Sequence, residues 1–128
     1  MMVFDSSAIY LAISQGKTQH LIGQYTTTLA MFELGNIIWK NSVLGKVYSQ
    51  KEALELLEAC ELILEKMKMA HPDLDDTYRL AANCRISFYD AAYVCLAVQL
   101  KAALVTLDNN LVKKIHSLVT ITPFERLG

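Results

Sequence analysis

The alternation of apolar and polar positions predicts short strands separated by helices. The clearest unit runs from Ser87 to Leu111. Its first half, an apolar run from Phe88 to about Lys101 behind Ser87 as N-cap, predicts a helix roughly 20 Å long at ~1.5 Å per residue. The second half, residues 103–107, has the composition of a strand and with its turn covers roughly 17–20 Å in return.

Because the two halves of this unit match in length, its two acidic residues meet at one edge. Asp90 lies in the first turn of the predicted helix, and Asp108 comes just past the predicted strand. Two carboxylates that are distant in sequence therefore converge.

The same pattern predicts the remaining elements. Short apolar runs and a Thr- and Tyr-rich run predict the other strands, at residues 1–4, 24–28 and 118–121. Three- and four-residue spacing of apolar positions predicts the other helices, at residues 6–13, 29–43, 49–69, 74–82 and 110–117. Residues 17–24 are ambiguous. Strands that alternate with helices indicate an α/β fold with a parallel sheet covered on both faces.

Length and composition limit the class of protein. A chain of 128 residues fits a single domain, residues 1–128, and 53% hydrophobic residues with a mean hydropathy of +0.27 support a sizeable core and exclude disorder. The longest apolar run, Ala91 to Val98, is too short to span a membrane. Cys60, Cys84 and Cys95 lack CxxC spacing, which indicates buried thiols in a reducing cytoplasm and disfavours a zinc site.

Four carboxylates are predicted to gather at the carboxyl edge of the sheet, where ligands bind in such folds. Asp5 ends the first strand, Glu33 and Asp90 lie in the opening turns of helices that begin at this edge, and Asp108 follows a later strand. Each aspartate also occupies a position where it could serve only as a helix cap, and that alternative stays open for each one alone. Glu33, on an otherwise apolar helix, is harder to explain by structure.

Four carboxylates at close range repel one another, and a hard divalent cation removes the conflict. Mg²⁺ and Mn²⁺ prefer oxygen ligands and bind through a few carboxylates, water and phosphate oxygens. Such a site supports phosphodiester hydrolysis without a nucleophilic side chain. The net charge of −1 does not exclude this, because setting the four acids aside leaves nine acidic against twelve basic residues, a balance of +3.

Four blocks of the sequence, VFDSSA, TTLAMFELGNIIWK, SFYDAAYVCLA and LVTLDNNL, resemble the PIN-domain ribonucleases, in particular the VapC-type toxins of prokaryotic toxin–antitoxin pairs. The blocks cover essentially the whole chain in the family's order. The resemblance implies a three-layer α/β/α sandwich with a five-stranded parallel sheet, Mg²⁺ or Mn²⁺ dependence and endoribonuclease activity on RNA. It also implies a cytoplasmic homodimer that a small antitoxin neutralises by covering the site.

The resemblance assigns roles to individual residues. The family's acidic positions fall on Asp5, Glu33, Asp90 and Asp108, and its small hydroxyl positions on Ser7 and Thr106. Many relatives carry a further acid shortly after the last of these. Here Asn109 and Asn110 occupy that stretch, and an asparagine such as Asn110 can ligate a metal or its water but adds no charge.

Two alternative functions remain open. One is a PIN-like domain that serves only in protein interaction, and the other is a housekeeping RNA-processing nuclease. Two other classes are excluded, because a haloacid-dehalogenase phosphatase needs a second acid where Ser7 stands, and a receiver domain needs an early acidic pair that is missing.

Residues outside the four acids could contact the substrate. No histidine falls near the four acids, but Tyr89 or Tyr93 lies close to Asp90 in sequence. The basic candidates are Lys40, Lys46, Arg85, Lys113 and Lys114.

Overall fold

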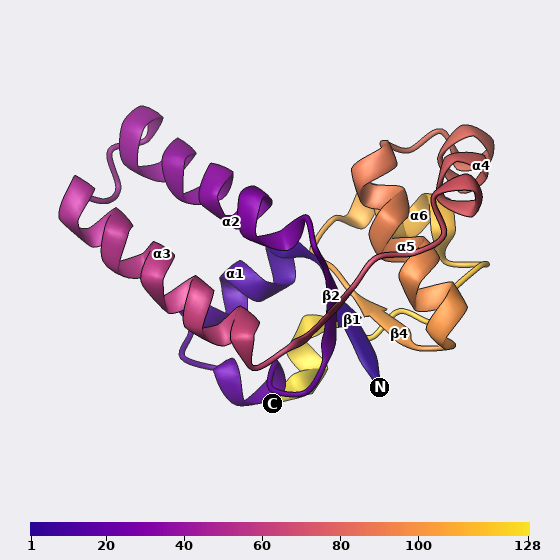
Figure 1. Ribbon diagram of the computed structural model, residues 1–128, viewed down its shortest axis with the longest axis horizontal. Helices are drawn as coiled ribbons and strands as arrows, with labels where there is room; N and C mark the ends of the chain where they lie inside the picture. Colours follow the sequence, from indigo (N-terminus) through magenta and orange to yellow (C-terminus); the bar gives the residue numbers. More distant parts are fainter.

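A four-stranded parallel sheet in the order β3-β2-β1-β4 forms the centre of the computed structural model, which describes residues 1–128 (Figure 1). The strands are β1 (Met2–Phe4), β2 (Tyr25–Thr27), β3 (Lys68–Ala70) and β4 (Ala103–Val105). In the middle of the sheet Val3 of β1 pairs with Tyr25 on one side and Leu104 on the other. The first strand in sequence therefore lies in the interior of the sheet.

Six α-helices cover the sheet: α1 (Ser6–Ser14), α2 (Ala30–Trp39), α3 (Gln50–Glu65), α4 (Leu74–Cys84), α5 (Phe88–Leu100) and α6 (Asn109–Ile115). Two short 3₁₀ helices, η1 (Thr18–His20) and η3 (Phe124–Leu127), and one π-helical turn, η2 (Lys40–Leu44), complete the chain. The turn η2 continues α2 outward, and α3 returns beside it to form an arm (Figure 1). None of the helices is long and apolar enough to cross a membrane.

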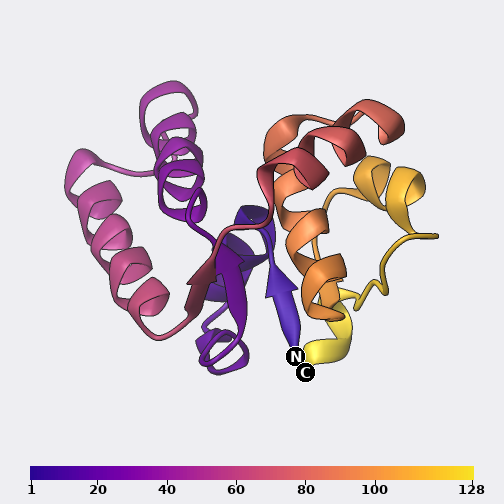
Figure 2. The ribbon, with the colours of Figure 1, turned by 45° about the vertical axis from the view of Figure 1, so that its right-hand side comes forward.

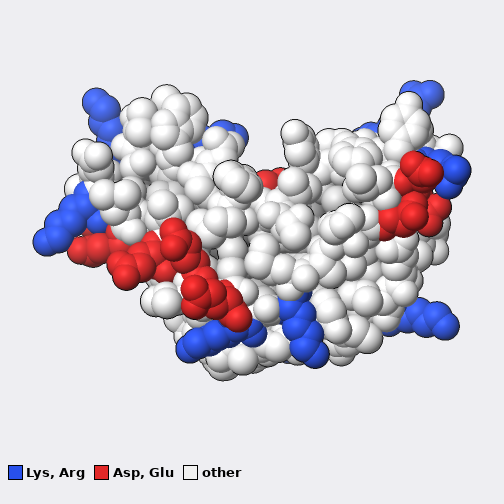
Figure 3. Space-filling model, in the orientation of Figure 1, with Lys and Arg blue, Asp and Glu red and all other residues white.

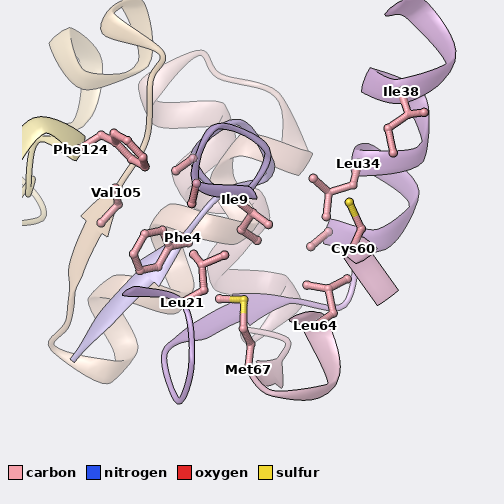
Figure 4. Packing of buried hydrophobic residues seen from close by; sticks show 13 residues of the cluster. Phe4, Ile9, Leu21, Leu34, Ile38, Cys60, Leu64, Met67, Val105 and Phe124 are labelled. Atoms are coloured by element: carbon pink, nitrogen blue, oxygen red, sulfur yellow. The ribbon is translucent and has the colours of Figure 1, made fainter. Parts of the chain in front are cut away.

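Two hydrophobic clusters hold the helices to opposite faces of the sheet. Side chains of a strand alternate between its faces, so Phe4 and Val105 face one cluster while Val3 and Leu104 face the other. The first cluster joins the sheet to α1, α2 and α3 (Figure 4), and the second joins it to α5 and α6, which lie with α4 on the other side (Figure 2). The result is a three-layer α/β/α arrangement.

Helices α5 and α3 differ in how they are stabilised. In α5 every residue from Ala91 to Ala97 is buried, which explains its uniformly apolar sequence. In α3 only Cys60 and Leu64 are buried, and a capping box between Ser49 and Glu52 fixes its start. The glutamates of α3 are exposed and form an acidic stripe on the surface (Figure 3), as expected for a solvated helix face.

The sheet has four strands, and the expectation of five was wrong. The predicted last strand, residues 118–121, contributes only one isolated bridge, between Ile121 and Leu104. The predicted helix 49–69 ends at Glu65, and its last residues instead form β3, which pairs with β2. The spacing of apolar residues along the sequence cannot reveal β3, because its three residues form a strand only by pairing with β2.

Candidate active site

At the carboxyl ends of β1 and β4, residues 5–7 lie against residues 105–107. The backbone N–H of Asp5 donates to the carbonyl of Val105 at 3.2 Å, and the hydroxyl of Ser7 accepts from the backbone N–H of Leu107 at 3.2 Å. Helices α2 and α5 begin at the same edge of the sheet. Figure 3 shows a hollow between the α2 side and the α5 side of the molecule, with acidic atoms at its floor.

Asp5 is the most enclosed of the four acids, with 7% of its surface exposed. Its Oδ1 accepts from the hydroxyl of Ser7 at 2.6 Å and from the backbone N–H of Ala8 at 3.0 Å. Burial raises the pKa of Asp5, whereas the hydrogen bonds from Ser7, Thr106 and Ala8 lower it. Asp5 therefore caps α1 itself, and three donors fix the orientation of its carboxylate.

Glu33, in the first turn of α2, is held by a residue from the opposite layer of helices. The hydroxyl of Tyr93 in α5 donates to Glu33 Oε1 at 2.5 Å, and the Tyr93 ring is 1% exposed. Burial raises the pKa of Glu33, and the negative charges of Asp90 and Asp5 raise it further. The bond from Tyr93 lowers this pKa and so favours the ionised carboxylate.

Asp90 and Asp108 lie at the openings of α5 and α6. Ser87 caps α5 by accepting from the backbone N–H of Asp90 at 3.0 Å, and a hydrogen bond between the Ser87 side chain and the half-buried Asp90 carboxylate lowers the pKa of Asp90. Burial raises the pKa of Asp90, as does the charge of Asp108. Asp108 caps α6 through Leu111, and its own backbone N–H donates to Thr106 Oγ1 at 3.1 Å.

The electrostatic couplings connect all four carboxylates. Asp90 raises the pKa of both Asp5 and Glu33, and Asp108 raises that of Asp90. Burial is the largest cause for each of the three raised groups. Such a set of neighbouring negative charges, most of them partly or fully buried, attracts a cation, because a cation removes the repulsion between the carboxylates.

The donor atoms suit a hard divalent cation. No three of these side chains, as they stand, lie close enough to hold an ion by themselves. Mg²⁺, however, keeps several waters and is usually bound by one or two carboxylates together with substrate phosphates. The oxygen-only set at this edge meets that requirement. Asn110 is exposed on α6 and makes no hydrogen bond with any of the four acids.

One partner in the site escapes prediction from sequence. Tyr93 is expected to contact substrate near Asp90, yet its hydroxyl points to Glu33, sixty residues earlier. A tyrosine in an otherwise apolar buried helix is the one sequence signal of such a contact, since a buried hydroxyl needs a partner. The apolar residue next to Glu33 also misleads, because Phe32 is 82% exposed although it lies in an apolar segment.

Comparison with known proteins identifies relatives of the whole fold. The family model "PIN domain" matches residues 2–116. The chain is 34% identical to Ribonuclease VapC3 of Pyrobaculum aerophilum over 111 residues, covering 85% of this chain and 80% of that protein. It is 31% identical to Exonuclease VapC9 of the same organism over 120 residues, covering 91% and 87%.

Solved structures show the same architecture. The crystal structure of PAE2754 from Pyrobaculum aerophilum superposes with a TM-score of 0.83 at 26% identity, over 98% of this chain and 92% of that one. VapBC-1 from nontypeable Haemophilus influenzae superposes with a TM-score of 0.65 at 14% identity, over 97% and 98%. The family model, the sequence relatives and the fold agree, and the chain belongs to the PIN domain family.

Proposed function

We propose that this protein is a Mg²⁺- or Mn²⁺-dependent endoribonuclease and the toxin of a VapBC-type toxin–antitoxin pair. The observation that carries the proposal is the coupled set of carboxylates at the carboxyl edge of the sheet, in which burial and like charges raise the pKa values of Asp5, Glu33 and Asp90. The similarity of the chain to a VapC ribonuclease and a VapC exonuclease supports assignment to the nucleases.

In the proposed mechanism the chain supplies oriented oxygen ligands. Asp5 and Asp90 would be the principal ligands of the metal, and Glu33 and Asp108 would complete the set. A bound divalent ion polarises a phosphoryl oxygen and makes water a stronger nucleophile. Ser7 and Thr106 act by holding Asp5 in place, since both donate hydrogen bonds to its carboxylate. Asn110, exposed in the first turn of α6, would add an uncharged amide oxygen to this set.

The metal and the reaction can be tested together. The wild-type protein should bind Mn²⁺ by calorimetry and cleave a circular single-stranded RNA, which has no ends for an exonuclease, and EDTA should stop the cleavage. Asp5→Asn and Asp90→Asn should lose Mn²⁺ binding and about 100-fold or more in cleavage. Asp75→Asn, an exposed acid on α4, is the matched control and should behave as wild type.

The proposal fails if Asp5→Asn and Asp90→Asn cleave RNA at the wild-type rate with unchanged melting curves. Cleavage of linear but not circular RNA would replace the endonuclease with an exonuclease. Absence of both metal binding and cleavage would favour a PIN-like interaction module.

The proposed assembly is a cytoplasmic homodimer bound by a small antitoxin protein. Solved neighbours of the fold include VapBC-1, and the family resemblance supplies the rest. Light scattering of the purified chain should give twice the mass of 14.4 kDa. Co-expression with the short reading frame beside its gene should yield a complex that no longer cleaves RNA. A monomer with no such partner would contradict this part of the proposal.

A further inference from the structure

A groove of about 460 Å³ leads away from the carboxylates along α2. Glu33 lies at its inner end and Lys40 at its outer end, and Tyr89 of α5 forms the opposite wall. Lys40 lies seven positions after Glu33, which corresponds to about 10 Å along a helix. The groove is therefore continuous with the proposed active site.

Two aromatic rings line the groove without serving the fold. Phe32 is 82% exposed and Tyr89 is 58% exposed. Helix α2 packs through another face, which buries Ala30, Leu34 and Ile38. Large aromatic side chains kept in water on both sides of a groove are unusual for packing and are typical of surfaces that bind a flat ring or an apolar group.

The charges along the groove favour a polyanion over an apolar partner. The structure contains one ion pair, Arg79–Asp76 on α4, so no acid neutralises Lys40. Asn36, midway along α2, is exposed and its amide can both donate and accept hydrogen bonds. An apolar protein segment seated here would desolvate Lys40 and Glu33 without compensation. A nucleic-acid strand instead offers a base to the rings and a phosphate to the lysine.

We propose that this groove binds one unpaired nucleotide of RNA beside the phosphodiester bond that is cleaved. The base stacks against the exposed rings of Phe32 and Tyr89, and its phosphate contacts Lys40. This inference rests on the proposed ribonuclease function and assigns three residues outside the carboxylate set to holding one nucleotide of the substrate. In a duplex the bases are already stacked and paired, so they are not available to the two rings.

Steady-state cleavage of a single-stranded oligoribonucleotide tests the aromatic rings. Phe32→Ala and Tyr89→Ala should each raise KM about 5- to 100-fold while kcat changes by about threefold or less, because stacking acts mainly in binding. Phe32→Tyr and Tyr89→Phe keep the rings and should retain the wild-type KM. Tyr78→Ala removes an equally exposed aromatic on α4 and should change nothing.

An abasic substrate series then identifies the stacked base. At one position next to the cleaved bond, removal of the base should raise KM for wild type by the same factor as Phe32→Ala. In the Phe32→Ala variant the same abasic substrate should cause no further increase in KM, because the two changes remove the same interaction. Lys40→Gln should reduce the slope of log Kd against log salt by about 0.7 to 1, whereas Lys66→Gln, at the opposite edge of the sheet, should leave it unchanged.

Unchanged KM values in both alanine variants would overturn the inference. Alanine variants that dissociate a dimer, or lose antitoxin binding, while their KM for RNA stays at the wild-type value would assign the groove to a protein partner and overturn it as well. If the wild-type protein cleaves no RNA, the proposed function fails, and RNA binding measured in EDTA by fluorescence anisotropy decides the groove separately. Ring-dependent binding would support it, and ring-independent binding would refute it.

Discussion

The bond between Tyr93 and Glu33 allows a prediction about stability. Tyr93→Phe keeps the buried ring and removes only the hydroxyl, which donates to Glu33 Oε1 at 2.5 Å. The variant should fold normally, because the ring that fills the core is unchanged. It should nevertheless be less stable, because the Glu33 carboxylate loses its donor inside a half-buried site.

The size of the loss follows from the burial of the two partners. A hydrogen bond to an ionised group contributes about 1.5–3 kcal/mol in proteins. Because Glu33 is half-buried and water can replace part of the bond, we expect about 1–2 kcal/mol. With an unfolding entropy of ~2.1 cal/mol/K per residue, 128 residues translate this into a decrease in Tm of about 4–7 °C.

The effect should depend on pH in a defined direction. The pKa of Glu33 is raised above its ordinary value of 4.5, and the bond from Tyr93 lowers it. The bond therefore stabilises the fold while Glu33 is ionised, and this contribution is lost as the pH falls through the Glu33 pKa. The Tm difference between wild type and Tyr93→Phe should be greatest at neutral pH and smallest in acid.

Thermal melts of metal-free protein across this pH range test the reasoning. Tyr78→Phe, which removes a hydroxyl from an exposed tyrosine, is the control. A double-mutant cycle with Glu33→Gln isolates the pairwise term and should recover most of the loss as coupling energy. A Tm difference independent of pH, or zero coupling, would refute the assignment of the bond as charge-assisted.

Three further predictions concern other parts of the chain. Metal-free Asp90→Asn should have a higher Tm than wild type at pH 7.5, because the raised pKa of Asp90 means that its negative charge destabilises the fold. This gain in Tm should disappear as the pH falls through the Asp90 pKa, and an equal gain at every pH would contradict the prediction. Lys101→Gly should raise the free energy of unfolding in guanidinium chloride by about 1 kcal/mol, because Lys101 ends α5 at a φ of +54°, a conformation that strains a residue with a side chain. A decrease instead would show that the packing of the Lys101 side chain stabilises the fold by more than the backbone strain destabilises it. Ser49→Ala should lower that free energy by about 1 kcal/mol through loss of the capping box and leave kcat unchanged, and a fall in kcat would link α3 to the site.

Local pattern was sufficient for the elements whose signals are strong within one segment. The unit from α5 to β4 matches the prediction closely, because Ser87 caps the helix and the buried run from Ala91 to Ala97 continues without interruption. β3 could not be found in this way, and the strand predicted at residues 118–121 forms only one isolated bridge, at Ile121. Both depend on backbone pairing with distant strands, which three or four residues of sequence do not encode.

The candidate site shows the same division. The four acids could be placed at one edge from strand ends and helix starts alone. Their environment could not: the bond from Tyr93 to Glu33 requires α2 and α5 to face one another across sixty residues of sequence. The exposure of Phe32 was likewise hidden, since an apolar residue in an apolar helix looks the same whether it faces the core or a groove.

The joining of β1 to β4 sets the order of events during synthesis. Asp5 leaves the ribosome about a hundred residues before its neighbours Val105 and Thr106 are made. Closing so long a loop is entropically costly until the contacts at both ends exist. An unfinished chain therefore has no assembled site, so a nuclease of this fold cannot attack the messenger or the ribosome from which it is still emerging.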